Sequence, residues 1–289
     1  MPPPSPGRLL LPGYAVCLRA ASEPHPSLAF ARRVAATIRG EARANVQRGG
    51  EPERNNRHQA GAEGALVLAS TSPRRRLLLA LLPLPFQTVA VEVDETPLAG
   101  EPAAVTAHRL AKLKARQAPA RADQWVLAAD TVVILDQVPL GKPADAADAA
   151  RMLRALRGRW HEVVTGVCLR PPGASPPLLA ERCTRVLMRS YRDDDIAAAV
   201  ASGVPLDKAG AYAIQDEVFR PVAALEGCYL NVVGLPLCAV SELLRRAGHP
   251  AAPALPPGPF QPPCSLCLAG ARLPGLGGLA LLTGRGSSP

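Results

Sequence analysis

The stretch Trp125–Leu135 constrains the fold of this chain more than any other, because it places a carboxylate inside an apolar run. Its β-branched residues and its short length predict a buried strand rather than a helix. An aspartate inside such a strand is costly unless it is paired, hydrogen-bonded or bound to a metal. Asp130 is therefore either a structural exception or the centre of a chemical site, and the strand alone does not decide between the two.

Composition divides the 289 residues into three segments. Residues 65–247 alternate apolar runs of strand length with amphipathic stretches, which predicts an α/β or α+β domain whose sheet is covered by helices. Residues 1–64, rich in Ala, Arg and Pro, and residues 248–289, rich in Pro and Gly, are predicted to be largely disordered. A transit peptide, an added extension and an early start codon would each explain residues 1–64, and we assign neither tail a function.

The charge and the apolar runs exclude several classes of protein. The formal net charge of +9 is spread over all three segments, and the middle one lacks the basic run with interleaved aromatics that is typical of nucleic-acid binding. No apolar run reaches the length of a membrane span, and the start has no secretory pattern. Seven cysteines, an odd number without disulfide spacing, fit a reducing compartment. We therefore expect a cytoplasmic protein with no nucleic-acid or membrane partner.

Two motifs look like metal sites but are weak. Cys264 and Cys267 form a C-x-x-C pair without a second pair or a nearby histidine, which is poor support for zinc. Asp193, Asp194 and Asp195 are consecutive acids, and their position at the positive end of a predicted helix explains them better than a metal does.

An anion site is predicted where the first strand of the middle segment, residues 65–69, meets a helix. Ser72 suits the N-cap of that helix and Pro73 suits its first position. Free N–H groups at the helix start, next to Arg74 and Arg75, would bind an anion. The alternative interpretation is an ordinary capped helix with solvated arginines.

The remaining charged residues of the middle segment have the composition that a triphosphate site needs. Its cations would offset phosphate charge, and its carboxylates would hold a divalent metal or activate water. A glutamine, with both a donor and an acceptor, can read the edge of a base. The candidates are Arg74, Arg75, Lys114 and Lys142 as cations, Glu95, Asp130 and Asp207 as carboxylates, and Gln215.

A series of motifs in the middle segment resembles, in order, those of the Maf proteins. The resemblance covers about residues 65–247. The motifs are Ser70-Thr71-Ser72-Pro73-Arg74-Arg75, Leu110-Ala111-x-x-Lys114-Ala115, Ala129-Asp130-Thr131-x-Val133, Gly141-Lys142-Pro143, the segment from Asp207 to Gln215, and Asn231-Val232-Val233-Gly234-Leu235-Pro236. Ala128 and Asp216 stand where the family often has glycine, and every charged position of the pattern is present.

The resemblance implies a fold and a reaction. The fold would be a long twisted mixed sheet with flanking helices, in two lobes around a cleft, like that of inosine triphosphate pyrophosphatases. The reaction would hydrolyse a nucleoside triphosphate to the monophosphate and pyrophosphate with a divalent metal, Mg²⁺ or Mn²⁺. The segment from Asp207 to Gln215 resembles the branch that acts on dTTP and UTP. The family also implies a homodimer.

The resemblance also implies roles for single residues. Asp130 matches the proton acceptor, and Glu95 would join it in binding the metal. The positions tied to base selection are matched by Arg74, Thr131 and Gln215. The phosphate-binding set would be Ser70, Arg75, Lys114 and Lys142.

A nucleotide-binding regulator of septum formation with little catalysis is the competing interpretation. The family is tied to septum formation and division arrest as well as to nucleotide house-cleaning. The complete set of charged positions favours the enzyme.

Overall fold

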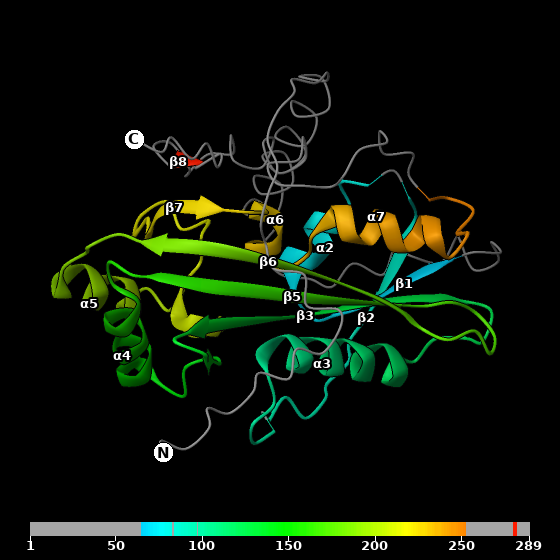
Figure 1. Ribbon diagram of the computed structural model, residues 1–289, viewed down its shortest axis with the longest axis horizontal. Helices are drawn as coiled ribbons and strands as arrows, with labels where there is room; N and C mark the ends of the chain where they lie inside the picture. The colour runs from blue at the N-terminus through cyan, green and yellow to red at the C-terminus, as the bar shows by residue number, and fades with distance from the viewer. Residues whose placement is uncertain (1–64, 83, 97, 253–279, 282–289) are drawn as a thin grey trace, which may run out of the picture.

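The computed structural model describes residues 65–252, except 83 and 97, together with the short strand at 280–281 (Figure 1). The expectations for residues 1–64, for nearly all of the C-terminal tail and for Cys264 and Cys267 lie outside the described residues.

A mixed sheet of eight strands forms the centre of the structure (Figure 1). Its first strand, β1, runs parallel to both of its neighbours, whereas β3, β5, β6 and β7 run antiparallel to one another. In spatial order the strands are β2 (Phe86–Val89), β1 (Leu66–Ala69), β3 (Trp125–Leu135), β5 (Trp160–Arg170), β6 (Leu178–Met188), β7 (Val222–Glu226) and β8 (Ala280–Leu281), with β4 (Val138–Leu140) paired to β3. The predicted α/β class, with a long mixed sheet and flanking helices, is confirmed.

Helices cover both faces of the sheet (Figure 1). One face carries α3 (Ala103–Gln117), and the other carries α2 (Pro73–Leu79), α6 (Tyr229–Val233) and α7 (Leu237–Arg246). At the far end of the long strands lie α4 (Ala146–Leu156), α5 (Asp193–Ala201) and the 3₁₀ turn η1 (Ala209–Ala211). In the part of the chain that the structure describes, no helix is long and apolar enough to cross a membrane.

The strand β3 is the central element, as its sequence predicts. Ten of its side chains are buried, and only Thr131 is half-buried. Because helices cover both faces of the sheet, its apolar residues serve the core on either side, which explains a continuous apolar run instead of an alternating one.

Small residues bring α3 very close to the sheet. Its buried face includes Ala107, Ala111 and Ala115, at helical spacing. Opposite Ala107 lies Gly166 of β5, which pairs in register with Asp130 of β3. The missing side chain of Gly166 therefore leaves room for the backbone of α3 beside Asp130.

Replacing Gly166 with Ala tests this close packing. The added Cβ would lie 2.8 Å from the carbonyl carbon and oxygen of Ala107, so α3 would have to move away from β5. We expect the variant to lose about 1–3 kcal/mol of unfolding free energy, measured by chemical denaturation.

The matched control is Gly141→Ala, because nothing lies within 4 Å of the Cβ it would add. Its unfolding free energy should stay within about 0.5 kcal/mol of the starting protein. Equal stability of the two variants would show that α3 does not depend on the small residue at position 166.

Candidate active site

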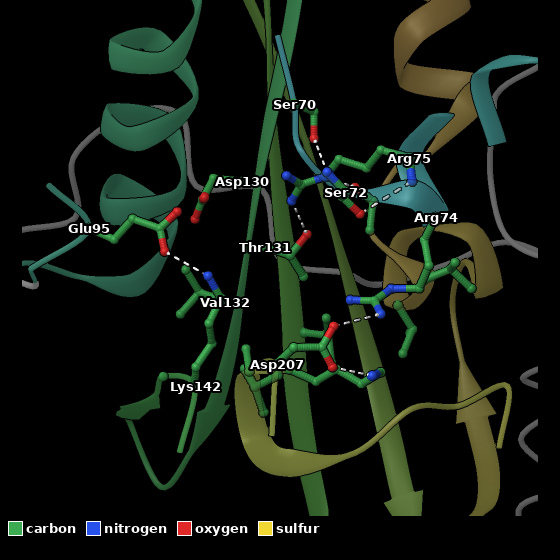
Figure 2. Close-up of a pocket in the computed structure, with 18 of the residues that line it drawn as sticks. Ser70, Ser72, Arg74, Arg75, Glu95, Asp130, Thr131, Val132, Lys142 and Asp207 are labelled. Carbon is green, nitrogen blue, oxygen red and sulfur yellow. Dashed lines mark hydrogen bonds and ion pairs between the residues drawn. The ribbon is translucent and has the colours of Figure 1, made fainter. Parts of the chain in front are cut away.

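A pocket of about 400 Å³ opens beside the middle of β3 (Figure 2). On this edge of β3, β1 pairs as far as Leu127 and β4 pairs from Val133 onward. Within the described residues, the stretch between them has no strand partner on that side. Asp130 and Thr131 lie in this gap, and their side chains point to opposite faces of the sheet because they are neighbours on a strand.

The pocket brings together every site residue that the sequence predicts. The β1–α2 turn, α3, β3, the β4 hairpin and the segment that follows α5 all contribute to its lining. The predicted residues that line it are Ser70, Arg74, Arg75, Glu95, Lys114, Asp130, Thr131, Lys142 and Gln215, joined by Asp207. The roles assigned to these residues stay predictions.

The turn between β1 and α2 has the local structure that its sequence predicts. Ser72 is the N-cap of α2, and its hydroxyl accepts a hydrogen bond from the Arg75 N–H at 3.4 Å. The Ser72 N–H donates in turn to the hydroxyl of Ser70 at 3.1 Å. Pro73 occupies the first helical position. The turn thereby holds Arg74 and Arg75 in the lining of the pocket.

The two arginines point to different parts of the pocket (Figure 2). Arg75 reaches β3, where Nη2 donates to Thr131 Oγ1 at 3.1 Å and Nε donates to the Gly234 carbonyl at 2.9 Å. Arg74 lies 3.7 Å from Asp207, with side chains 33% and 69% exposed. An ion pair so exposed adds little to stability, so Arg74 can leave it for a ligand at low cost.

Two carboxylates and two lysines form a cluster on the α3 side of the pocket. Lys114 Nζ, on α3, donates to Asp130 Oδ1 and to Glu95 Oε1, both at 2.6 Å. Lys142 Nζ, after β4, donates to Glu95 Oε2 at 3.3 Å. The side chains of Lys114 and Asp130 are only 9% and 10% exposed. The buried lysine therefore compensates the carboxylate that was unusual in the sequence.

The pKa of Glu95 is lowered within this cluster. Partial burial acts to raise the pKa, but the hydrogen bonds and charges of Lys114 and Lys142 outweigh it. Glu95 is therefore an anion at neutral pH. Its side chain is 43% exposed and lies at the open side of the cluster.

The segment with Gln215 is anchored by a contact that the sequence did not reveal. Tyr212 lines the pocket, and its hydroxyl lies 2.7 Å from Nε2 of the buried His161 on β5. Burial lowers the pKa of His161 to about 4, so this histidine is neutral at physiological pH. The contact fixes Tyr212 close to Gln215, which is half-buried at the pocket wall.

The carboxylates fit a divalent cation that is shared with a ligand. The described residues contain no group of three or more His, Cys, Asp or Glu that could hold a metal, and the aspartates of α5 form its first turn instead. Glu95 and Asp130 converge on one ammonium, so both can also reach one cation. Mg²⁺ typically takes one or two carboxylates and completes its shell with water and phosphate oxygens.

Comparisons with known sequences and structures find several similar proteins. Residues 65–247 match the family described as Maf-like protein. A dTTP/UTP pyrophosphatase of Thermomicrobium roseum is 50% identical over 189 residues, which cover 64% of this chain and 85% of the relative. One from Geobacter sulfurreducens is 46% identical over 187 residues, or 64% and 98% of the two chains. The match to a solved structure, that of the Staphylococcus aureus Ham1 protein, covers 44% of this chain and 73% of the Ham1 chain. The sequence identity is 13% and the TM-score is 0.34.

Removing Lys114 should leave Asp130 buried without its counter-charge. We expect Lys114→Met to lower the unfolding free energy by about 3–5 kcal/mol. Adding Asp130→Asn should recover part of this loss, because the uncompensated charge disappears. Chemical denaturation of the two single variants and the double variant measures this coupling.

Lys112→Met is the control, since Lys112 is exposed on the same helix. It should change stability by no more than about 0.5 kcal/mol. If the losses at Lys112 and Lys114 are equal, the buried pair does not hold the cluster together.

Proposed function

Because this chain belongs to the Maf-like protein family, we propose that it is a nucleoside triphosphate pyrophosphatase that acts on dTTP and UTP. Two relatives, which match this chain over most of their own length at 46–50% identity, carry the name dTTP/UTP pyrophosphatase. The observation that carries the proposal is the separation of charge in one pocket. A buried carboxylate held by a lysine lies on the α3 side, and two arginines lie across from it.

The cations of the pocket would bind the triphosphate. Arg75 and Arg74 stand at the start of α2, and Lys142 approaches from the β4 hairpin. The Lys142 side chain is 59% exposed, so its ammonium can turn from Glu95 to a phosphate oxygen. Phosphoryl transfer depends mainly on positioning and on electrostatic stabilisation of this kind.

Asp130 would act as the general base. Lys114 engages its Oδ1, and Oδ2 has no hydrogen bond to any described residue, so Oδ2 is available to a water molecule. As Asp130 takes the proton, the water oxygen bonds to the α-phosphorus. The bond from that phosphorus to the oxygen bridging the α- and β-phosphates breaks. Pyrophosphate leaves with the bridging oxygen, and the nucleoside monophosphate remains.

Glu95 and Asp130 would hold the divalent cation, Mg²⁺ or Mn²⁺. A bound cation would neutralise charge on the phosphate oxygens of the substrate. Lys114 remains close to both carboxylates and limits how far they can move apart.

Gln215, with Arg74 and Thr131, would select the base. The amide of Gln215 offers a donor and an acceptor together, which match a carbonyl and the adjacent ring N–H of uracil or thymine. A site built for such a pair rejects bases that leave its polar groups unpaired. The segment from Asp207 to Gln215 supports the pyrimidine branch through its resemblance to that branch.

The cellular setting is part of the same proposal. We place the protein in the cytoplasm as a homodimer, without a nucleic-acid or membrane partner. The cysteine pattern and the family resemblance support this placement. Burial raises the pKa of the Cys168 thiol to about 11, so this cysteine is an unreactive core residue.

The experiment that tests the proposed function is pyrophosphate release from a panel of nucleotides. The panel contains dTTP, UTP, CTP, GTP and 7-methyl-GTP, each with Mg²⁺, with Mn²⁺ and with EDTA. We expect metal-dependent turnover of dTTP and UTP above the others. Turnover of a different base would reject the proposed selectivity, and nucleotide binding without pyrophosphate release would favour the regulator of septum formation.

Replacing Asp130 with Asn tests the general base. We expect a loss of about 10²–10⁴-fold in kcat, because the amide cannot accept the proton from water. The control is Asp123→Asn, which removes an exposed carboxylate paired with Arg121, away from the pocket lining, and should keep full activity. Nearly full activity in a folded Asp130→Asn variant would remove Asp130 from this role.

A further inference from the structure

A continuous chain of hydrogen bonds runs from Arg75 into the core of the protein. The guanidinium Nη2 of Arg75 donates to Thr131 Oγ1 at 3.1 Å, and Thr131 Oγ1 lies 2.9 Å from Thr165 Oγ1. Thr165 in turn donates to the main-chain carbonyl of Asn231 at 3.0 Å. Thr131 and Thr165 face each other in the register of β3 and β5. The side chain of Thr165 is fully buried.

The number of hydrogens fixes the direction of this chain. A hydroxyl has one hydrogen to donate and can accept two hydrogen bonds. Thr165 donates its one hydrogen to the Asn231 carbonyl, so it must accept a hydrogen bond from Thr131. Thr131 then has no hydrogen left for a ligand, and it accepts from Arg75. Every bond of the chain therefore points from the guanidinium toward the carbonyl of Asn231.

The carbonyl that ends the chain belongs to a helix that is itself firmly anchored. Asn231 lies in α6 and is fully buried. Its side-chain amide donates to the Val163 carbonyl at 2.8 Å and to Thr184 Oγ1 at 2.9 Å. These bonds tie α6 to β5 and β6, which are two of the longest strands of the sheet.

The same helix also holds the other side of the guanidinium. Gly234 follows α6 as its C-cap, and its carbonyl accepts from Arg75 Nε at 2.9 Å. Gly234 has φ 121°, a conformation that glycine adopts readily and other residues rarely do. Arg75 is thus fixed directly through Gly234 and indirectly through Thr131 and Thr165. Within the described residues, no hydrogen bond engages the Nη1 hydrogens or the second Nη2 hydrogen of Arg75, so these hydrogens are available to a ligand.

We propose that Thr165 is a positioning residue for the triphosphate, because it fixes Thr131 and through it aims Arg75 into the pocket. The inference rests on the proposed function, in which Arg75 binds phosphate. Thr165 itself makes no contact with substrate. It also defines how Thr131 could take part in base selection: its one hydrogen is donated to Thr165, so its hydroxyl could contact the base only as an acceptor.

The first test replaces Thr165 with Val, which has the same shape but no hydroxyl. A misaimed guanidinium binds the phosphates less well, so we expect KM for dTTP to rise about tenfold with a smaller change in kcat. Thr165→Ser keeps the hydroxyl and should restore KM to within about twofold of the starting value. A change that only lowered the folded fraction would reduce apparent kcat and leave KM unaltered.

A second pair of variants covers the case in which Thr165→Val does not fold. Thr165→Ser and Thr165→Ala both lack the γ-methyl group and differ only in the hydroxyl. Thr165→Ala should show the raised KM, and Thr165→Ser should not. Equal KM values for this pair, or an unchanged KM in a folded Thr165→Val variant, would overturn the inference.

The link to Arg75 is tested in the Arg75→Lys background. Lysine lacks the planar fork that spans Gly234 and Thr131, so removing the Thr165 hydroxyl should then change KM by less than about twofold. A tenfold change that persists with Lys at position 75 would show that Thr165 acts by another route.

Binding of inorganic tripolyphosphate, measured by calorimetry, separates this inference from the proposed function. Thr165→Val should bind it about tenfold more weakly than the unaltered protein does. One outcome is that Thr165→Val binds tripolyphosphate more weakly than the unaltered protein, while the unaltered protein releases no pyrophosphate from any nucleotide. In that case the proposed function fails and the positioning role stands. If dTTP is turned over and tripolyphosphate affinity is the same in both proteins, the positioning role fails alone.

Discussion

The buried ion pair between Lys114 and Asp130 is the interaction on which the rest of the structure depends. Its two atoms lie 2.6 Å apart with both side chains about nine-tenths buried. Taking two charges out of water is costly, and the cost is recovered only when the geometry is fixed. The fold supplies that geometry through the small residues of α3, the missing side chain of Gly166, and a central strand that is buried on both faces. The exposed residues Glu95 and Lys142 complete the cluster. Because their side chains are exposed, these two residues can exchange each other for a ligand.

Because successive side chains of a β-strand point to opposite faces of the sheet, one short stretch of β3 contributes side chains to two walls of the pocket. Asp130 points toward α3, and its neighbour Thr131 points toward α2 and α6. Since β1 and β4 leave this part of the β3 edge uncovered, both side chains reach the same opening. Glu95 and Asp130 therefore gather with Lys114 and Lys142 on one side, and the arginines lie on the other. This arrangement suits a substrate with negative phosphates and a water molecule to be deprotonated.

Residues close together in sequence could be predicted, and contacts between distant elements could not. The buried strand around Asp130 and the Ser72 cap both follow from local patterns, and the structure confirms both. The motifs also identified the residues that line the pocket. By contrast, the pairing of Lys114 with Asp130 depends on how α3 docks, and Lys114 was expected only to bind phosphate. Thr165 and His161 carry no motif, because their importance arises from strand register and burial.

We propose that water activated by Asp130 attacks the α-phosphorus of the substrate. Hydrolysis of dTTP in ¹⁸O-labelled water, with mass spectrometry of the products, tests this claim most directly. We expect one ¹⁸O atom in the phosphate of dTMP and none in pyrophosphate. Label in pyrophosphate, or release of labelled orthophosphate in its place, would show attack at another phosphorus and would contradict the proposed reaction.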